Sequence, residues 1–362
     1  MAGKGRVVVG MSGGVDSSTA AALLHAQGYE VIGVTMRLWT VPDETAPVHH
    51  RHCCSIEDTD DARAAAQVIG IPHYVLNFEE EFRRSVVEYF VAEYRRGRTP
   101  NPCLACNEHV KFRAFLDRAR ALGADYVATG HYARVARDGE TYRLLRAADP
   151  EKDQSYVLYT LGQEELRSIL FPLGTYTKDR VRALAAELGL PVADKPDSAD
   201  ICFVPGGDYR AFLAQYVPTR PGPVVDTAGN VVGQHEGVSG FTVGQRRGLG
   251  AFGARRYVVE LRPEANTVVV GGAEELLSDV CWAEQLRFVN GPPAGALEVE
   301  AKIRYRTAAA PALLRVQGDR AEVRFREPQR AVTPGQAVVF YVGDEVIGGG
   351  IIEGRGRRAA PS

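Results

Sequence analysis

The chain has little of what marks a membrane or secreted protein. No apolar run approaches the roughly 20 residues that a membrane-spanning helix needs. Near the start, Arg6-Val7-Val8-Val9 leads directly into a glycine turn, without the apolar stretch of a secretory signal. We therefore expect a cytoplasmic protein with no membrane partner.

Cysteine is also scarce, with 6 residues in a chain of 362. Structural disulfides are not expected in a reducing cytosol, which leaves reactive, metal-binding or buried thiols. Cys281, beside Trp282, is predicted to be buried and inert. Cys53 and Cys54 follow a stretch rich in histidine, and both a metal site and a packing role stay open there.

A strong charge of either sign is missing too. The formal net charge is −2 at pH 7, so the bulk charge does not predict a nucleic-acid partner. An RNA site would have to come from local clusters, and each cluster alone is more typical of a solvated surface. The clusters are Arg95-Arg96-Gly97-Arg98, Arg246-Arg247, Arg255-Arg256 and Arg304-Tyr305-Arg306.

Buried strands alternate with helical patterns in the first part of the chain. The strands are predicted at Val7–Val9, Glu30–Met36, Pro72–Leu76 and Asp125–His131. Helices are predicted between and after them, at Glu79–Arg96, His109–Leu122, Gln163–Leu170 and Lys178–Leu188. This order predicts an α/β, Rossmann-like parallel sheet with helices on both faces. Ligands of such sheets bind beyond the carboxyl ends of the strands, so Ser12, Met36 and Gly130-His131 should converge.

The later part of the chain has the texture of β structure. Asp138-Gly139 predicts a hairpin turn. From about Val204, glycine and proline are frequent and short apolar alternation predicts a small β-rich domain. Longer alternating strands after Trp282 predict a β-barrel or sandwich, and the basic tail from Gly354 is predicted to be disordered. The expected domains are 1–203, 204–279 and 280–362.

The segment between the first strand and the first helix has the composition of an anion site. Its glycines permit a tight turn, and the N–H groups at the start of a helix favour phosphate. Ser12, Ser17 and Ser18 add hydroxyl donors, and Asp16 would orient a phosphate-bound Mg²⁺. The loop is not a Walker A loop, because no lysine lies inside it. A plain glycine turn is the alternative, but six specified residues between a strand and a helix favour the phosphate site.

A lysine-free Ser-Gly-Gly-x-Asp-Ser loop resembles the pyrophosphate loop of ATP pyrophosphatases, which leave AMP on a substrate oxygen. Such a site needs an acceptor and a group that displaces AMP, and a thiolate or persulfide is a strong nucleophile near neutral pH. Two cysteine contexts stand out, Asn101-Pro102-Cys103-Leu104-Ala105-Cys106-Asn107 and Asp197-Ser198-Ala199-Asp200-Ile201-Cys202-Phe203. The first lies in a proline-containing stretch, Gly97–Asn107, that is predicted to be a loop.

With these blocks in view, the whole chain resembles the tRNA-specific 2-thiouridylases, which replace the C2 oxygen of the wobble uridine, position 34, with sulfur. Further blocks carry the resemblance: Ala128-Thr129-Gly130-His131-Tyr132, Lys152-Asp153-Gln154-Ser155-Tyr156, Phe241–Gly250 and Pro334-Gly335-Gln336. The block Phe241–Gly250 can alternatively be only a β-hairpin with a basic turn. The resemblance also implies a sulfurtransferase that uses ATP and Mg²⁺.

The resemblance implies a role for each matching residue. ATP would be held by Gly10, Met11, Ser12, Gly13, Gly14, Val15, Asp16, Ser17, Met36 and Gly130. Cys106 would be the nucleophile and Cys202 would carry the persulfide. The target base would lie against Asn101, Pro102 and Cys103, and tRNA would contact His131, Lys152, Asp153, Gln154, Arg304, Tyr305 and Gln336. The implied partners are tRNAs for Lys, Glu and Gln and a persulfide-donating sulfur carrier or cysteine desulfurase.

Several alternatives stay open. Some family members carry Asp at the position of Cys103; here Cys103, Cys106 and Cys202 supply three ligands for a four-iron four-sulfur cluster with one open iron. A first rival function is another ATP-pyrophosphatase ligase or amidotransferase acting on a small molecule, which explains the loop but not the cysteines or the β domains. A second rival is a non-catalytic RNA-binding or redox-sensing protein, which predicts that Asp16→Ala and Cys202→Ser retain full function.

Overall fold

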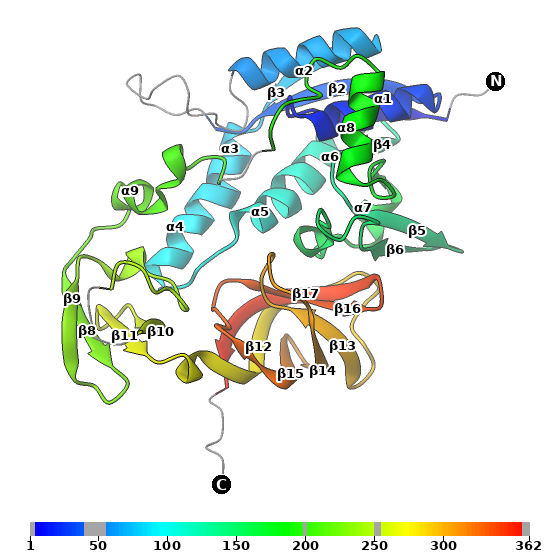
Figure 1. Cartoon of the computed structure of the whole chain (residues 1–362). Helices are drawn as coiled ribbons and strands as arrows, with labels where there is room; N and C mark the ends of the chain where they lie inside the picture. The colour runs from blue at the N-terminus through cyan, green and yellow to red at the C-terminus, as the bar shows by residue number, and fades with distance from the viewer. Residues whose placement is uncertain (1–3, 40–55, 198–200, 250–254, 357–362) are drawn as a thin grey trace. The chain divides into compact units, whose positions relative to one another are not determined.

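The structure is a computed structural model that describes residues 4–39, 56–197, 201–249 and 255–356 (Figure 1). The chain divides into two compact units. The first comprises Met1–Val87, Pro102–Gly207 and Asp344–Val346, and the second comprises Glu88–Asn101, Asp208–Gly343 and Ile347–Ser362. The stretch with Cys53 and Cys54 lies outside the described residues.

A five-stranded parallel sheet is the centre of the first unit. Its strand order is β3-β2-β1-β4-β7. The strands are β1 (Arg6–Gly10), β2 (Glu30–Arg37), β3 (His73–Asn77), β4 (Tyr126–Ala128) and β7 (Ile169–Leu170). Val7, Val8 and Val9 of the central strand have no exposed surface, as a sheet covered on both faces requires. The predicted Rossmann-like fold is confirmed.

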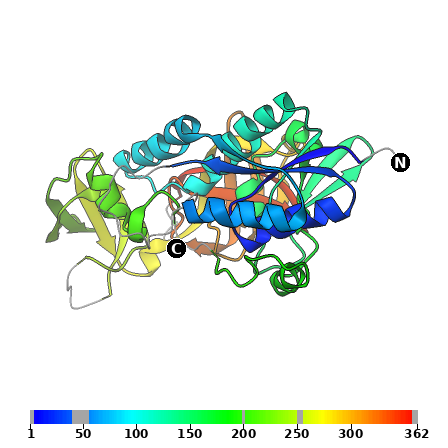
Figure 2. The ribbon, with the colours of Figure 1, turned by 90° about the horizontal axis from the view of Figure 1, so that it is seen from above.

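Helices cover both faces of this sheet. On one face, α1 (Val15–Ala26) and α2 (Ile56–Ile69) pack with Val7 and Val9. On the other face lies α6 (Phe115–Ala121), and Figure 2 shows α1 and α2 opposite α6 across the strands. The helix α8 (Lys178–Glu187) shares a buried cluster with α1. The helix α8 therefore packs next to the junction where β1, the glycine loop and α1 meet.

The structure corrects the expected loop at Gly97–Asn107. A helix begins at Pro102, as α5 (Pro102–Ala105), and continues as the π-helical turns η2 (Cys106–Ala114) into α6. Proline fits the first turn of a helix, because its missing N–H would have no partner there. Cys103 and Cys106 therefore lie on a helix.

Other elements follow the expected order with small differences. The predicted helix at Glu79–Arg96 consists of α3 (Glu79–Phe82), the π-helical η1 (Arg83–Val87) and α4 (Glu88–Arg95). The predicted helix at Gln163–Leu170 ends early, because α7 (Gln163–Arg167) is followed by β7 at the sheet edge. The hairpin β5 (Arg134–Asp138) and β6 (Thr141–Leu145) is confirmed, with Gly139 at φ 61° in its turn. Short 3-10 turns are η3 (Ser155–Leu158) and η4 (Pro205–Gly207).

The second unit contains α4 and α9 (Tyr209–Ala214), which pack through aromatic side chains, a four-stranded sheet and a β-barrel. The helix α4 packs on α9, where Tyr94 stacks on Tyr209 with ring centroids 5.5 Å apart. A four-stranded sheet has the order β10-β11-β8-β9. Its strands are β8 (Gly222–Asp226), β9 (Val231–His235), β10 (Tyr257–Arg262) and β11 (Thr267–Gly271).

The C-terminal strands close into a six-stranded barrel in the order β12-β15-β14-β13-β16-β17, with β12 also paired to β17. They are β12 (Leu277–Phe288), β13 (Leu297–Lys302), β14 (Ala310–Gln317), β15 (Arg320–Arg330), β16 (Ala337–Val342) and β17 (Glu345–Arg355). The 3-10 turn η6 (Glu274–Leu276) precedes β12. Cys281 is fully buried in the barrel core, and burial raises the pKa of its thiol, as expected for an inert cysteine.

In the second unit, one expectation is wrong and one alternative does not hold. Gly354 and Arg355 belong to β17, because Trp282 and Cys281 of β12 pair with them, so the tail does not begin at Gly354. The described part of Phe241–Gly250 is a series of turns after η5 (Val238–Gly240) and not a hairpin, since its apolar side chains are drawn into the cores beside the sheet. No helix in the described parts of the chain is long and apolar enough to cross a bilayer.

Candidate active site

The glycine loop follows β1 at the carboxyl end of the parallel sheet. Its backbone is fixed at Met11, whose N–H donates to Val34 O at 2.8 Å and whose carbonyl accepts from Thr35 Oγ1 at 2.8 Å. The Ser12 N–H donates to Ser17 Oγ at 3.1 Å, which folds the loop back on the first turn of α1. The N-cap of α1 is Gly14, and no side chain caps the helix. The first amides of α1 are therefore available to an anion.

Close contacts explain three of the glycines, two of them against backbone and one against a side chain. Gly13 has φ +71°, and a Cβ there would run into the carbonyl of Asp58. A Cβ on Gly130 would lie 2.7 Å from the Asp16 carbonyl carbon and 2.7 Å from the Ser17 nitrogen. A Cβ on Gly10 would lie 3.2 Å from the terminal methyl of Met36. The ends of β1, β2 and β4 thus meet at the loop, as the parallel topology predicts.

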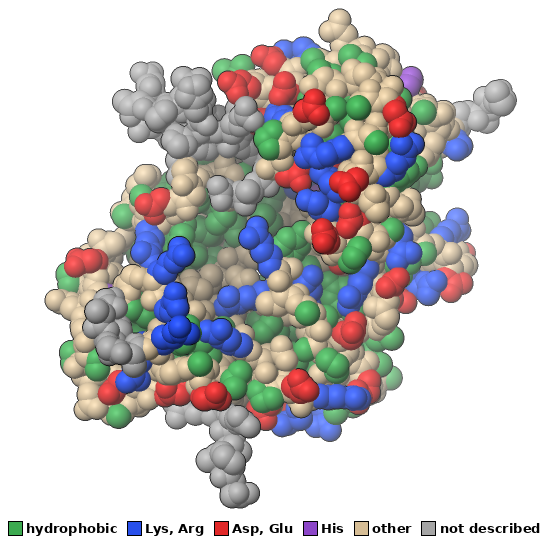
Figure 3. All heavy atoms as spheres, in the orientation of Figure 1, with side chains coloured by type: hydrophobic (Ala, Val, Ile, Leu, Met, Phe, Trp, Pro, Cys, Tyr) green, Lys and Arg blue, Asp and Glu red, His purple; other side chains and the backbone are tan. Residues whose placement is uncertain are grey.

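Lys178 supplies a cation to this loop from the first position of α8. Its ammonium lies 2.8 Å from both carboxylate oxygens of Asp16 and 2.8 Å from Asp197 Oδ1. Only 9% of its side chain is exposed. Tyr132 completes the arrangement by donating its hydroxyl to Asp16 Oδ1 at 2.8 Å. Around α8, basic and acidic side chains alternate on the surface (Figure 3).

Asp197 collects three cations. Besides Lys178, it contacts Lys152 at 2.9 Å and Arg182 at 3.0 Å. Burial opposes the charged form of Asp197, but the hydrogen bonds from Lys178 and Lys152 outweigh it and lower the pKa of the carboxyl to about 2. Burial and the Asp16 carboxylate raise the pKa of Tyr132 far above its ordinary value, so the phenol stays a hydrogen-bond donor.

A second lysine holds the outer side of the loop. Lys195 Nζ donates to Gly13 O at 3.0 Å, to Asp58 at 2.7 Å and to Asp61 at 2.5 Å. Burial lowers the pKa of Lys195, but the two carboxylates of α2 outweigh it and raise the pKa overall. The start of α2 and the glycine turn are therefore joined through one half-buried ammonium.

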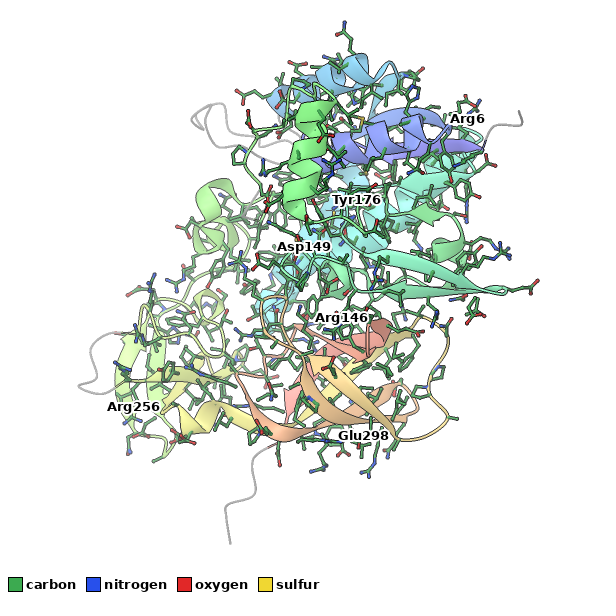
Figure 4. The ribbon with its side chains drawn as sticks, turned by 45° about the vertical axis from the view of Figure 1, so that its right-hand side comes forward. Arg6, Arg146, Asp149, Tyr176, Arg256 and Glu298 are labelled. Carbon is green, nitrogen blue, oxygen red and sulfur yellow. The ribbon has the colours of Figure 1, made fainter. Side chains whose placement is uncertain are left out.

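The predicted tRNA-contacting segment 152–154 is tied to the same region. Asp153 accepts hydrogen bonds from Ala147 N at 3.0 Å and Ser155 Oγ at 2.8 Å, and Gln154 Oε1 accepts from Tyr132 N at 2.9 Å. These side chains shape the segment, whereas the half-exposed Lys152 reaches Asp197. Just before the segment, Asp149 Oδ2 accepts from the Lys178 N–H at 2.9 Å at the base of α8 (Figure 4).

His131 is buried and not at the surface. Its Nδ1 lies 2.7 Å from Thr129 Oγ1, and its ring lies against Phe112 and Phe171. Burial, with Lys111 nearby, lowers its pKa well below the usual value, so the ring is neutral at pH 7. The tRNA contact expected of His131 stays a prediction, and the structure gives the ring a place in the core behind Gly130.

The cysteines of the first unit differ in exposure. Cys106 is 7% exposed and opens the π-helical η2, a helix form that recurs at functional sites. Cys103 is exposed and Cys202 is half-buried. Among residues 4–39, 56–197, 201–249 and 255–356, no three Cys, His, Asp or Glu side chains gather as a metal site would require. The iron–sulfur alternative for Cys103, Cys106 and Cys202 therefore gains no support.

Several predicted tRNA- and base-contacting residues lie in the second unit. Arg304 donates to Val243 O at 3.0 Å and Ala331 O at 3.2 Å, so its guanidinium closes the junction of barrel and sheet. Tyr305 lies under Lys302, whose ammonium is 5.7 Å from the ring centroid. Gln336 Nε2 donates to Thr99 O at 2.7 Å. This bond holds the segment that leads to Asn101, after which Pro102 begins α5.

Sequence reasoning missed Lys178, Asp197 and Tyr132 as parts of the site. The sequence did hold one signal for Lys178. A lysine at the first position of a helix is unfavourable because it opposes the helix dipole, so a lysine there indicates a compensating partner. Lys178 follows the N-cap Thr177 directly, and its burial needs a compensating carboxylate. That partner, Asp16, is 162 positions away, and no local pattern reveals it.

Comparison with known proteins places this architecture. A family model described as tRNA methyl transferase HUP domain matches residues 5–206. A model described as tRNA methyl transferase PRC-barrel domain matches residues 210–272, and one described as aminomethyltransferase beta-barrel domain matches residues 278–352. The parallel sheet with its lysine-free glycine loop thus defines a HUP-class α/β domain, followed by two β domains.

Relatives match almost from end to end. A protein of Carboxydothermus hydrogenoformans, named tRNA-specific 2-thiouridylase MnmA, is 53% identical over 98% of this chain and 99% of its own length. Proteins of the same name from Roseiflexus castenholzii and Moorella thermoacetica are 52% and 53% identical, each over 96% of this chain and 99% of their own. The chain belongs to the tRNA-specific 2-thiouridylase family.

Proposed function

We propose that this protein is a tRNA-uridine 2-sulfurtransferase, which converts the wobble uridine at position 34 of tRNA to 2-thiouridine and turns ATP into AMP and pyrophosphate. The carrying observation is the glycine loop at the end of β1, closed by Gly130 against Asp16 and Ser17. The relatives that are 53% identical over nearly the whole chain are named for this activity, which supports the substrate.

The loop fits a polyphosphate. At Gly13 the Asp58 carbonyl already fills the space that a Cβ would need, and α1 offers its amides without a side-chain cap. Gly10 to Ser17, Met36 and Gly130 would hold ATP. Asp16 already holds a cation, the Lys178 ammonium, at 2.8 Å. When bound there, Mg²⁺ would neutralise charge on the departing pyrophosphate.

The first step must convert the C2 oxygen of uridine into a better leaving group. The C2 oxygen of uridine is a poor leaving group, whereas an AMP ester leaves readily. The oxygen attacks the α-phosphorus of ATP, the bond to the β-phosphate bridging oxygen breaks, and pyrophosphate leaves with the electron pair. Loop amides and the Lys178 ammonium stabilise the charge that develops.

Sulfur then replaces AMP. The terminal sulfur of a Cys202 persulfide attacks C2, and AMP leaves with the electron pair of the C–O bond. The Cys106 thiolate attacks the Cys202 sulfur, which leaves the terminal sulfur on the base and forms a Cys106–Cys202 disulfide. In the other order Cys106 first releases hydrosulfide, which then attacks C2. Either order oxidises the two thiols by two electrons, and an external thiol must reduce the disulfide.

The remaining assignments belong to the same proposal. Asn101, Pro102 and Cys103 face the target base, which must leave its stack in the anticodon loop. The segment 152–154 contacts tRNA or supports the residues that do. The same holds for His131, Arg304, Tyr305 and Gln336. The tRNAs are those for Lys, Glu and Gln, and the sulfur comes from a persulfide carrier or cysteine desulfurase. The domain boundaries stay as proposed, at 1–203, 204–279 and 280–362.

The test is an anaerobic reaction with ATP, Mg²⁺, a persulfide source and unmodified tRNA, followed by mass analysis of the nucleosides. We expect 2-thiouridine with the wild type and none with Cys202→Ser or Cys106→Ser, while pyrophosphate release depends on tRNA. Pyrophosphate release without tRNA and without thiouridine would instead favour a ligase or amidotransferase of small molecules. Loss of product in Cys103→Ala, with ATP binding retained, would support the base contact.

A further inference from the structure

Cys202 lies between two anchors of different chemistry. Five positions before it, Asp197 is held by ion pairs, and one position after it, Phe203 is fully buried. The ring of Phe203 lies 5.7 Å from that of Phe82 and 6.5 Å from that of Trp39, each edge to face. Such aromatic contacts add to the burial of the ring, so the downstream side of Cys202 is fixed in the core.

The upstream anchor is ionic and borders the glycine loop. Asp197 contacts Lys178 and Arg182 of α8 and Lys152 of the segment after the hairpin, all within 3.0 Å. Arg182 also donates to the carbonyls of Ala193 at 3.0 Å and Lys195 at 3.1 Å. The backbone from 193 to 197 is therefore attached to α8 at three points before the chain continues to Cys202.

These contacts link the upstream anchor to the nucleotide site. Lys178 is shared, since the same ammonium lies 2.8 Å from Asp16 of the loop and 2.8 Å from Asp197. A chain of five residues spans at most about 17 Å, so an anchored Asp197 limits how far Cys202 moves from the loop. The low pKa of Asp197, about 2, means that the anchor is charged throughout the physiological range.

We propose that Asp197 is a positioning residue for Cys202, so that sulfur transfer depends on it while nucleotide binding does not. This inference rests on the proposed function, because Cys202 matters only if it delivers sulfur. The charge balance gives it a sharp consequence. Asp197→Asn leaves Lys152, Lys178 and Arg182 in place, and the surroundings of the loop become more positive, which favours the anionic nucleotide.

The experiment measures two products of one reaction. For Asp197→Asn, we expect the rate of 2-thiouridine formation to fall about 10- to 100-fold, the usual effect of displacing a reacting group. The KM for ATP should stay within about twofold or fall. The ratio of pyrophosphate released to 2-thiouridine formed should rise, because adenylated tRNA waits for sulfur. The control is Asp194→Asn, which removes the same charge from an exposed position of the same segment.

A second variant keeps the proposal testable if Asp197→Asn impairs folding. Arg182→Gln removes the other main contact of the anchor, and we expect the same rise in the product ratio, with the double variant no worse than the worse single one. The proposal is overturned if Asp197→Asn forms 2-thiouridine at the wild-type rate. It is also overturned if the KM for ATP or tRNA rises tenfold with an unchanged product ratio. Wild-type protein that makes no 2-thiouridine defeats the proposed function instead.

Discussion

At the scale of single residues, the glycine loop has no lysine of its own, unlike a Walker A loop, and the cation beside it is Lys178. Its ammonium reaches the loop from α8 and bonds both oxygens of Asp16. A lysine at the start of a helix is unfavourable by itself, and the two carboxylates offset that cost. The glycines and Asp16 of the loop were predictable from their spacing. The lysine was not, because only the packing of α8 on α1 brings it there.

The first prediction concerns this lysine. Lys178→Met removes the cation from the loop, leaves Asp16 without its ion pair and makes the site more negative. We expect the KM for ATP to rise about 10-fold or more, as for the loss of a hydrogen bond to a charged group. Steady-state kinetics with saturating tRNA measure it. The matched control is Arg180→Met on the same helix, where the cation pairs with Glu187; equal effects of both changes would contradict the assignment.

The second prediction concerns acid. The pKa of Asp197 is depressed to about 2 in the fold, so the unfolded chain binds this proton more readily than the native protein does. The stabilisation by Asp197 is therefore present above its ordinary pKa and is lost as the pH falls toward 2. We expect Asp197→Asn to lower the melting temperature more at pH 6 than at pH 3. A difference that is constant between these pH values would refute the ion-pair role.

At the scale of elements, three strand ends meet at the loop because parallel strands end at one edge of a sheet. This convergence was predictable, since β-branched runs marked the strands and glycines marked the turns. The helix from Pro102 was not predicted, because proline is typical both of loops and of the first helical turn. The π-helical turns η1 and η2 were not predicted either, and η2 begins at Cys106.

The third prediction tests the contact between strand end and loop. Gly130→Ala places a methyl group 2.7 Å from backbone atoms of Asp16 and Ser17, so the loop must shift. Backbone atoms cannot turn aside as a side chain does, and we expect ATP binding to weaken about 10-fold or more while the fold persists. Isothermal calorimetry with ATP measures this. Gly295→Ala is the control, because no atom lies within 4 Å of the new methyl group.

At the scale of the whole molecule, the charge is nearly balanced, with 43 basic and 45 acidic residues. Many basic residues of the barrel are paired, as Arg320 with Glu353 and Arg324 with Glu322. Arg246 and Arg247 are exposed, and within the described part of the chain no carboxylate pairs with them. Affinity for an RNA backbone must therefore come from such local positions and not from the bulk charge.

The fourth prediction follows from this distribution. The double variant Arg246→Gln, Arg247→Gln should weaken tRNA binding and reduce the slope of log affinity against log salt by about 1 to 2. Filter binding over a salt series measures the slope. Arg320→Gln with Arg324→Gln is the control, since those cations are already paired within the barrel. An unchanged slope in the first variant would assign Arg246 and Arg247 to a merely solvated surface.

The packing of α4 determines whether the N-terminal part of the chain can be produced or exchanged alone. Phe90 and Tyr94 are buried against Phe212 and Tyr209, although α4 precedes the cysteine-bearing helix in the chain. Thr99 is likewise held by Pro334 and Gln336 of the barrel. Residues 1–207 therefore do not form an independent folding unit. Produced alone, they would expose the aromatic face of α4 and aggregate. A chimaera that exchanges residues 1–207 must keep α4 together with the α9 that it packs against.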